Sequence, residues 1–135
     1  MSETPSRAIE VHDSYLGRIE KTGTSIELHF EPAYVHQSSG EPGVASGTGW
    51  IQNALFTLSD ASLEGDPFKL PADLYDGTLV VDGTEIRTLL ALPSEYVGEI
   101  VLTLSDRQSG TTVLFRCSRL TIAATGEAEY VEDVE

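Results

Sequence analysis

The sequence has almost no cysteine: Cys117 is the only one among 135 residues. No disulfide can therefore form within the chain, which argues against a small secreted fold held together by disulfides. Cys117 alternates with Val113 and Phe115, which predicts that it is a buried small hydrophobic residue on one face of a strand. The same pattern argues against a catalytic thiol.

Long apolar runs are also missing. No stretch approaches the length needed to span a bilayer, and residues 1–14 contain no apolar segment of the kind found in a signal peptide. The sequence therefore predicts a soluble, cytoplasmic protein without a membrane partner.

Basic residues are scarce, because 22 Asp and Glu stand against eight Lys and Arg, for a formal net charge of −14. This charge repels nucleic acids and anionic lipids, so we expect neither as a partner. It would attract a basic protein, although a charge that only keeps the protein soluble and monomeric is the commoner explanation of such a composition. No motif indicates a cofactor, and none is expected.

Helical spacing of apolar residues is absent, whereas alternation with a period of two recurs in short runs bounded by turn residues. We predict an all-β domain over residues 1–135, with a mainly antiparallel β-sandwich or flattened barrel of about eight strands. Residues 1–7 are expected to be flexible, and residues 125–135 to form an acidic segment with Tyr130 and Val131 as anchors. Besides the two hairpins below, the predicted strands are 8–12, 50–58, 99–104, 111–117 and 119–124.

Two hairpin turns can be predicted. Asp82-Gly83 is typical of a type I′ turn and would place Leu79 opposite Ile86. Thr22-Gly23 predicts a second turn, with Ile19 opposite Ile26 and Arg18 opposite Glu27. In the second hairpin, the alternation over 25–30 points Ile26, Leu28 and Phe30 inward and leaves His29 outside beside Glu27.

Two connections are expected between the strands. Residues 31–49 hold four of the twelve glycines and two of the six prolines, which predicts a long loop that is either functional or disordered. Residues 67–75 predict one short helical turn with Pro71 at its first position.

Metal binding is one function that the side chains permit. His12, His29 and His36 lie in the first third of the chain, and together with Asp13 they could form a metal site on a β scaffold. Their spacing matches no compact ligand motif, and His12 and His29 are explained as outward polar positions of strands. Ser14 lacks the flanking glycines of a hydrolase nucleophile, so Asp13-Ser14 is interpreted as a structural corner.

Binding through aromatic groups is the second possibility. Tyr34, His36 and Trp50 lie in or next to the predicted long loop, and amphipathic rings of this kind often anchor a partner. Trp50 also opens an apolar strand, so burial in the core explains it better than a binding role does. The candidate binding residues are therefore Tyr34, His36, Trp50, His12 and Asp13.

The opening of the chain resembles the start of several small bacterial β-rich families, some of which are immunity proteins. The resemblance covers about twenty residues and depends on a His-Asp-Ser corner followed by a hairpin. The matching residues are His12, Asp13, Ser14, Leu16, Ile19, Leu28 and Phe30. It implies a cytoplasmic protein that binds and blocks a toxin, and it brings no catalytic residue.

Three functions follow from these observations. The first is a non-enzymatic domain that binds a basic protein. The second is a barrel that binds a small molecule or a metal through His12, Asp13, His29 and His36. The third is a structural or regulatory domain without a pocket.

Overall fold

The computed structural model of the chain describes residues 6–38, 47–65, 69–86 and 89–134. These residues form eleven strands, all paired antiparallel, which confirms the all-β prediction. The strands are β1 (Ser6–Glu10), β2 (Tyr15–Thr22), β3 (Ser25–Ser38), β4 (Gly47–Ser59), β5 (Ser62–Glu64), β6 (Ala72–Val81), β7 (Thr84–Ile86), β8 (Leu89–Ala91), β9 (Ser94–Asp106), β10 (Thr112–Ala124) and β11 (Glu129–Val134). None of these described segments is a helix that could cross a bilayer.

Six strands close into a barrel. Its order around the ring is β2, β3, β4, β10, β9 and β6, and β6 pairs again with β2. The closing pairs are Tyr15 with Asp73 and Leu16 with Ala72. This short seam completes the ring at the point where Leu16 enters the core.

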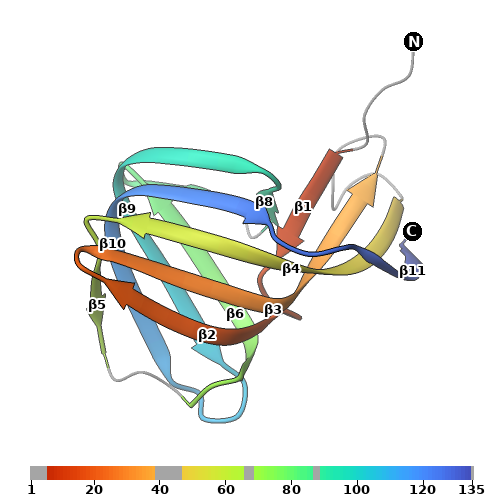
Figure 1. Cartoon of the computed structure of the whole chain (residues 1–135), viewed down its shortest axis with the longest axis horizontal. Coiled ribbons are helices and arrows are strands. Elements are labelled where there is room, and N and C mark those ends of the chain that lie inside the picture. The colour runs from red at the N-terminus through yellow and green to blue at the C-terminus, as the bar shows by residue number, and fades with distance from the viewer. Residues whose placement is uncertain (1–5, 39–46, 66–68, 87–88, 135) are drawn as a thin grey trace.

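One part of the same sheet projects from the barrel, and we call it the extension. It consists of residues 33–38 of β3 and 47–52 of β4, with β1 and β11 on either side and β8 beyond β1. Figure 1 shows β1, β11 and the far ends of β3 and β4 reaching to one side of the barrel. The hairpin of β3 and β4 is continuous, with a register shift between Phe30 and Ala33 where it leaves the barrel.

Two changes of partner create the extension. Along one edge of β3, β2 pairs up to Phe30 and β1 takes over from Tyr34. Along the far edge of β4, β10 pairs down to Ala54 and β11 takes over from Ile51. The chain must therefore turn sharply twice, over residues 11–14 and 125–128, and the first turn carries the His-Asp-Ser corner.

The core follows the alternation in the sequence. Ile26, Leu28 and Phe30 are fully buried, as predicted, and the rings of Phe30 and Phe56 lie 4.4 Å apart. Cys117 is buried, also as predicted. Burial raises the pKa of its thiol to about 11, so the thiol stays protonated and unreactive at neutral pH.

The prediction of a long loop over 31–49 is wrong for residues 31–38 and 47–49, which extend β3 and β4. The prolines and glycines misled the prediction, since Pro32 lies at the register shift, where a strand tolerates a residue without an N–H. Residues 39–46 lie outside the described residues. So do residues 1–5 of the expected flexible N-terminus, while Ser6 and Arg7 already belong to β1.

The helical turn predicted over 67–75 is also wrong for the residues that the structure describes there. Ala72–Val81 forms β6, with Ala72 and Leu74 buried and Tyr75 exposed. Pro71 lies just before the first residue of β6. The missing N–H of proline removes no hydrogen bond between strands at this position. Residues 66–68 lie outside the described part.

One of the two predicted hairpin registers is confirmed. Leu79 pairs with Ile86, and both Asp82 and Gly83 have the positive φ that a type I′ turn requires. The other register is wrong: Thr22 pairs with Ser25, so the turn is Gly23-Thr24, one residue later than predicted, and Ile19 lies opposite Leu28 in place of Ile26. Arg18 consequently faces His29 rather than Glu27.

The end of the chain is more regular than predicted. The predicted strands 111–117 and 119–124 are one strand, β10, with a register shift at Ser118. The acidic segment predicted over 125–135 contains a paired strand, β11.

Candidate functional site

The corner between β1 and β2 is built by backbone hydrogen bonds. Ser14 N–H donates to the carbonyl of Val11, and Asp13 N–H donates to the carbonyl of Leu74 on β6. Asp13 adopts a φ of 83°, which Asp tolerates better than most residues. The corner therefore joins the extension to the barrel.

Ser14 has a structural role, as predicted. Its hydroxyl donates to the carbonyl of Glu10 at 2.7 Å and accepts from the N–H of Tyr34 at 2.9 Å. The side chain is fully buried, and its two bonds tie β1 to β3. Such a hydroxyl is not available as a nucleophile.

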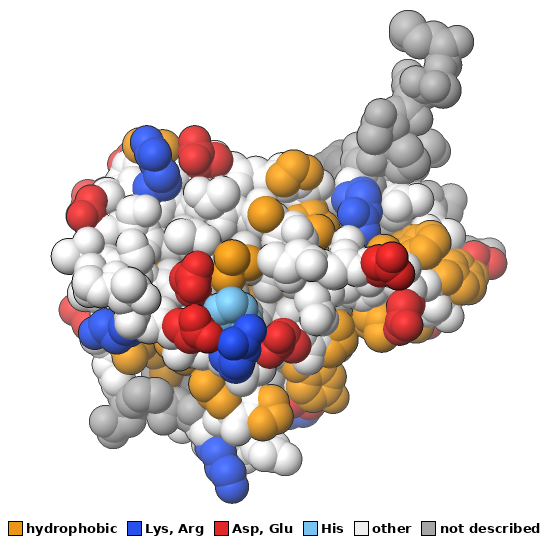
Figure 2. All heavy atoms as spheres, in the orientation of Figure 1, with side chains coloured by type: hydrophobic (Ala, Val, Ile, Leu, Met, Phe, Trp, Pro, Cys, Tyr) orange, Lys and Arg blue, Asp and Glu red, His pale blue; other side chains and the backbone are white. Residues whose placement is uncertain are grey.

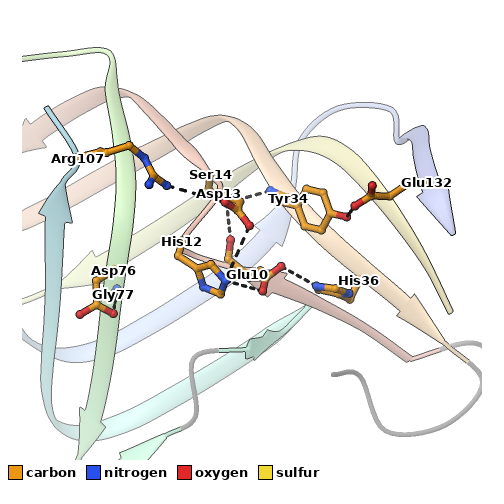
Figure 3. Close-up of polar contacts among 10 residues, drawn as sticks. All are labelled: Glu10, His12, Asp13, Ser14, Tyr34, His36, Asp76, Gly77, Arg107 and Glu132. Atoms are coloured by element: carbon orange, nitrogen blue, oxygen red, sulfur yellow. Dashed lines mark hydrogen bonds and ion pairs between the residues drawn. The ribbon is translucent and has the colours of Figure 1, made fainter. Parts of the chain in front are cut away.

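A carboxylate that the sequence analysis did not single out, Glu10, lies at the centre of the site (Figure 3). Its Oε1 is 2.7 Å from Nε2 of His12, and its Oε2 is 2.6 Å from Nε2 of His36. An ionised carboxylate only accepts hydrogen bonds, so His36 donates to Glu10 from Nε2. Glu10 and His36 are largely buried, whereas the side chain of His12 is 40% exposed.

Asp13 lies beside this group. Its Oδ2 is 3.8 Å from Nε2 of His12, and its Oδ1 is 3.9 Å from Nη2 of Arg107. Arg107 is itself held by Asp73, at 3.1 Å between Nε and Oδ2. The three residues come from the corner, β6 and the connection after β9.

Tyr34 and His36 continue this face of the extension. The two rings meet edge to face at 5.2 Å, and the Tyr34 hydroxyl donates to Glu132 of β11 at 2.6 Å. Burial and this hydrogen bond raise the pKa of Tyr34 above its ordinary value. The phenol is therefore a neutral donor that links β3 to β11 across β4.

Trp50 belongs to the opposite face, because its partners across the sheet are Val35 and Tyr130. Its ring is half-buried and meets Tyr130 edge to face at 5.6 Å. The three predicted anchors thus divide between the two faces of the extension, with Tyr34 and His36 on one and Trp50 on the other.

His29 lies apart from the other histidines, on the barrel. Its Nε2 is 3.8 Å from both Glu20 and Glu27, and its Nδ1 is 3.2 Å from Nη2 of Arg18. The structure therefore does not bring His29 together with His12, Asp13 and His36. The structure divides that set and groups His12, Asp13 and His36 around Glu10.

A hollow of about 250 Å³ opens where the extension meets the barrel. Apolar groups of Pro32 and Ile51 line it together with the carboxylates of Glu127 and Glu129. Its remaining lining residues are Gln52, Asn53 and Gly126. Two apolar and two acidic residues in a mainly polar lining suit the alkyl chain and charged end of a lysine or arginine.

Sequence reasoning missed Glu10, Arg107 and Glu132. Glu10 carried a usable signal, since it alternates with His12 on one strand and must share its face. Arg107 and Glu132 carried none, because only the fold brings them near residues 13 and 34.

Comparison of the chain with protein-family models, with curated proteins and with solved structures finds no match.

Proposed function

We propose that this protein is a non-enzymatic binding module that recognises an extended, basic segment of another protein along β11. The observation that carries the proposal is the position and charge of this strand. β11 lies at one end of the strand order, and four carboxylates occur on it or just before it. They belong to Glu127, Glu129, Glu132 and Asp133.

An edge strand supports binding through its backbone. In the described residues β11 pairs on one side only, with β4. Its outer N–H and C=O groups form a template on which an extended peptide can add a further strand. Main-chain hydrogen bonds of this kind supply affinity, while the side chains on either face supply specificity.

The carboxylates would select the partner by charge. They repel the same edge of a second copy, which protects the strand from self-association, and they attract Lys and Arg. Figure 2 shows acidic side chains beside hydrophobic ones on the side of the molecule that the extension occupies. The edge therefore favours a strand in which basic residues alternate with apolar ones.

Anchoring groups lie next to the edge. Tyr130 and Val131 are 54% and 46% exposed, and Tyr130 packs on Trp50. The hollow beside Glu127 and Glu129 would receive one basic side chain. The resemblance of the opening residues to immunity proteins suggests a specific form of this function, the cytoplasmic blocking of a basic toxin.

The first experiment selects binders from a displayed library of random ten-residue peptides. We expect enriched peptides to carry Lys or Arg at alternate positions, and their binding to protect outward-facing amides of β11 from hydrogen exchange. Enrichment of neutral or acidic peptides, or protection elsewhere, would contradict the proposal. A domain without a binding pocket would enrich no peptide.

The second experiment neutralises the edge without removing the strand. We expect the variant E127Q/E129Q/E132Q/D133N to bind the selected peptide with an association rate lowered about tenfold and less sensitive to salt. The matched control neutralises four exposed carboxylates of β5, β7 and β9, in E64Q/E85Q/E95Q/E99Q. Equal association rates for the two variants, measured by stopped flow, would show that only the total charge matters.

A further inference from the structure

We infer that the corner between β1 and β2 is a binding site for a divalent transition-metal ion of the Zn²⁺ class. The ligands would be Oε1 of Glu10, Nε2 of His12 and Oδ2 of Asp13. This site is separate from the β11 edge and does not depend on the proposed function.

The three donor groups already lie together. Each of the three residues offers one ligand atom, and these atoms all lie within 4.8 Å of one another. Glu10 Oε1 is 2.7 Å from His12 Nε2, which is 3.8 Å from Asp13 Oδ2. Two ligands bound tetrahedrally to Zn²⁺ at about 2.1 Å lie roughly 3.4 Å apart. An ion therefore requires the first pair to open by about 0.7 Å and the second to close by about 0.4 Å.

Local backbone geometry explains why these donors converge. Glu10 and His12 alternate along the chain and share one face. The left-handed φ of Asp13 and the hydrogen bond from its N–H to the carbonyl of Leu74 turn the Asp13 side chain back toward that face. The donors thus come from four consecutive positions that the corner holds in place.

In Glu10 and in Asp13, the second carboxylate oxygen, which would not bind the ion, has a basic partner. Oε2 of Glu10 is held by His36 at 2.6 Å, and Oδ1 of Asp13 is approached by Arg107 at 3.9 Å (Figure 3). Such outer partners orient the ligating oxygen toward an ion. His36 keeps its proton on Nε2 for this purpose, while His12 must carry its proton on Nδ1 when it ligates.

The donor set defines the class of ion. One imidazole and two carboxylates suit Zn²⁺, Ni²⁺ or Cu²⁺, whereas Ca²⁺ and Mg²⁺ prefer oxygen ligands alone. His12 and Asp13 are 40% and 53% exposed, so water can complete the coordination. The two carboxylates together balance the charge of the ion.

A similar group on the barrel, formed by Glu20, Glu27 and His29, serves as a contrast. Arg18 approaches Nδ1 of His29 at 3.2 Å, and a guanidinium can only donate. Neutral His29 must therefore carry its proton on Nε2, the nitrogen that faces the two carboxylates. The guanidinium also pairs with Glu20 at 2.8 Å. The positive charge of Arg18 thus already balances the carboxylates that an ion would neutralise there.

Calorimetric titration of the whole chain with Zn²⁺ tests the site. We expect one ion per chain with micromolar affinity, similar behaviour with Ni²⁺ and no heat from Mg²⁺. Glu10→Gln and His12→Asn should each weaken Zn²⁺ binding at least tenfold, and His36→Asn should weaken it by a smaller factor. His29→Asn is the matched control and should bind as the wild type does.

A second measurement needs no variant. Substoichiometric Ni²⁺, which is paramagnetic in this ligand environment, should broaden the imidazole NMR signals of His12 and leave those of His29 sharp. The inference is overturned if the wild type binds no Zn²⁺ at millimolar concentration, or if folded His12→Asn binds as tightly as the wild type. Selective broadening of His29 would also overturn it.

Discussion

Single carboxylates link separate segments of this protein, because each one contacts donor groups from more than one segment. Glu10 faces Tyr34 in the register of β1 and β3, which makes His36 its diagonal neighbour on the same face. Diagonal neighbours in an antiparallel pair lie within reach of long side chains. The proximity of His36 to Glu10 is therefore a consequence of strand register.

Asp106 is the buried counterpart of this arrangement. Its Oδ2 accepts hydrogen bonds from the N–H and the hydroxyl of Ser109, at 3.1 and 2.7 Å. Burial acts to raise the pKa of Asp106, but these hydrogen bonds outweigh it and hold the pKa below its ordinary value of 3.8. The charged form is thus stabilised in the folded state.

Replacement of Asp106 should change the dependence of stability on pH. Because its folded pKa is lowered, its stabilisation is complete above the unfolded pKa and is lost as the pH falls through the folded value. We expect Asp106→Asn to lower the free energy of unfolding by about 1–2 kcal/mol at pH 7. The difference from wild type should shrink below about pH 4.

Urea titrations between pH 2.5 and 7 provide this measurement. Glu85→Gln, at an exposed position on β7, is the control and should change the free energy of unfolding by no more than about 0.5 kcal/mol. A difference between Asp106→Asn and wild type that persists unchanged to pH 2.5 would show that the charge of Asp106 does not stabilise the turn.

At the scale of elements, turns and corners direct the strands. The Asp82-Gly83 turn fixes the hairpin of β6 and β7, with φ values of 50° and 80°. A Cβ added to Gly83 would meet no atom within 4 Å, so a substitution there has only a conformational cost. Gly83 therefore isolates the contribution of backbone geometry to the hairpin.

We expect Gly83→Val to lower the free energy of unfolding by about 1–2 kcal/mol, because a β-branched residue is disfavoured at positive φ. Gly83→Asn is the matched variant and should cost less, since Asn adopts this conformation more readily. Thermal melts of the two variants measure the difference. Equal melting temperatures for Gly83→Val and wild type would mean that the turn is not type I′ in solution.

At the scale of the whole molecule, the division into barrel and extension determines where the two proposed binding regions lie. The barrel encloses the core, while the extension presents the β11 edge and the corner site at its junction with the barrel. A formal net charge of −14 on a chain of 135 residues also produces repulsion throughout the folded protein. Folding brings these charges closer together than they are in the unfolded chain.

Salt should therefore stabilise the fold. Raising the ionic strength from about 0.01 M to about 0.1 M shortens the Debye length from roughly 30 to 10 Å and screens the repulsion. We expect the melting temperature to rise by several degrees over this range. The variant E64Q/E85Q/E95Q/E99Q should show a smaller rise, and a melting temperature that falls with salt would contradict net repulsion.

The sequence by itself determined the fold class, the inward faces of the strands and the hairpin at Asp82-Gly83. These features depend on the alternation of apolar and polar residues and on the φ preferences of single residues. Both are properties of residues close together in the sequence. It also indicated the corner at Asp13-Ser14, because short polar side chains satisfy a bent backbone locally.

Only the tertiary structure decided where the strands end and which side chains meet. Residues 31–38 have the composition of a loop, yet β1 and β4 pair with them and satisfy their backbone groups. The position of Arg107 beside Asp13 likewise follows from strand register and ring closure. These are long-range pairings, and no local pattern encodes them.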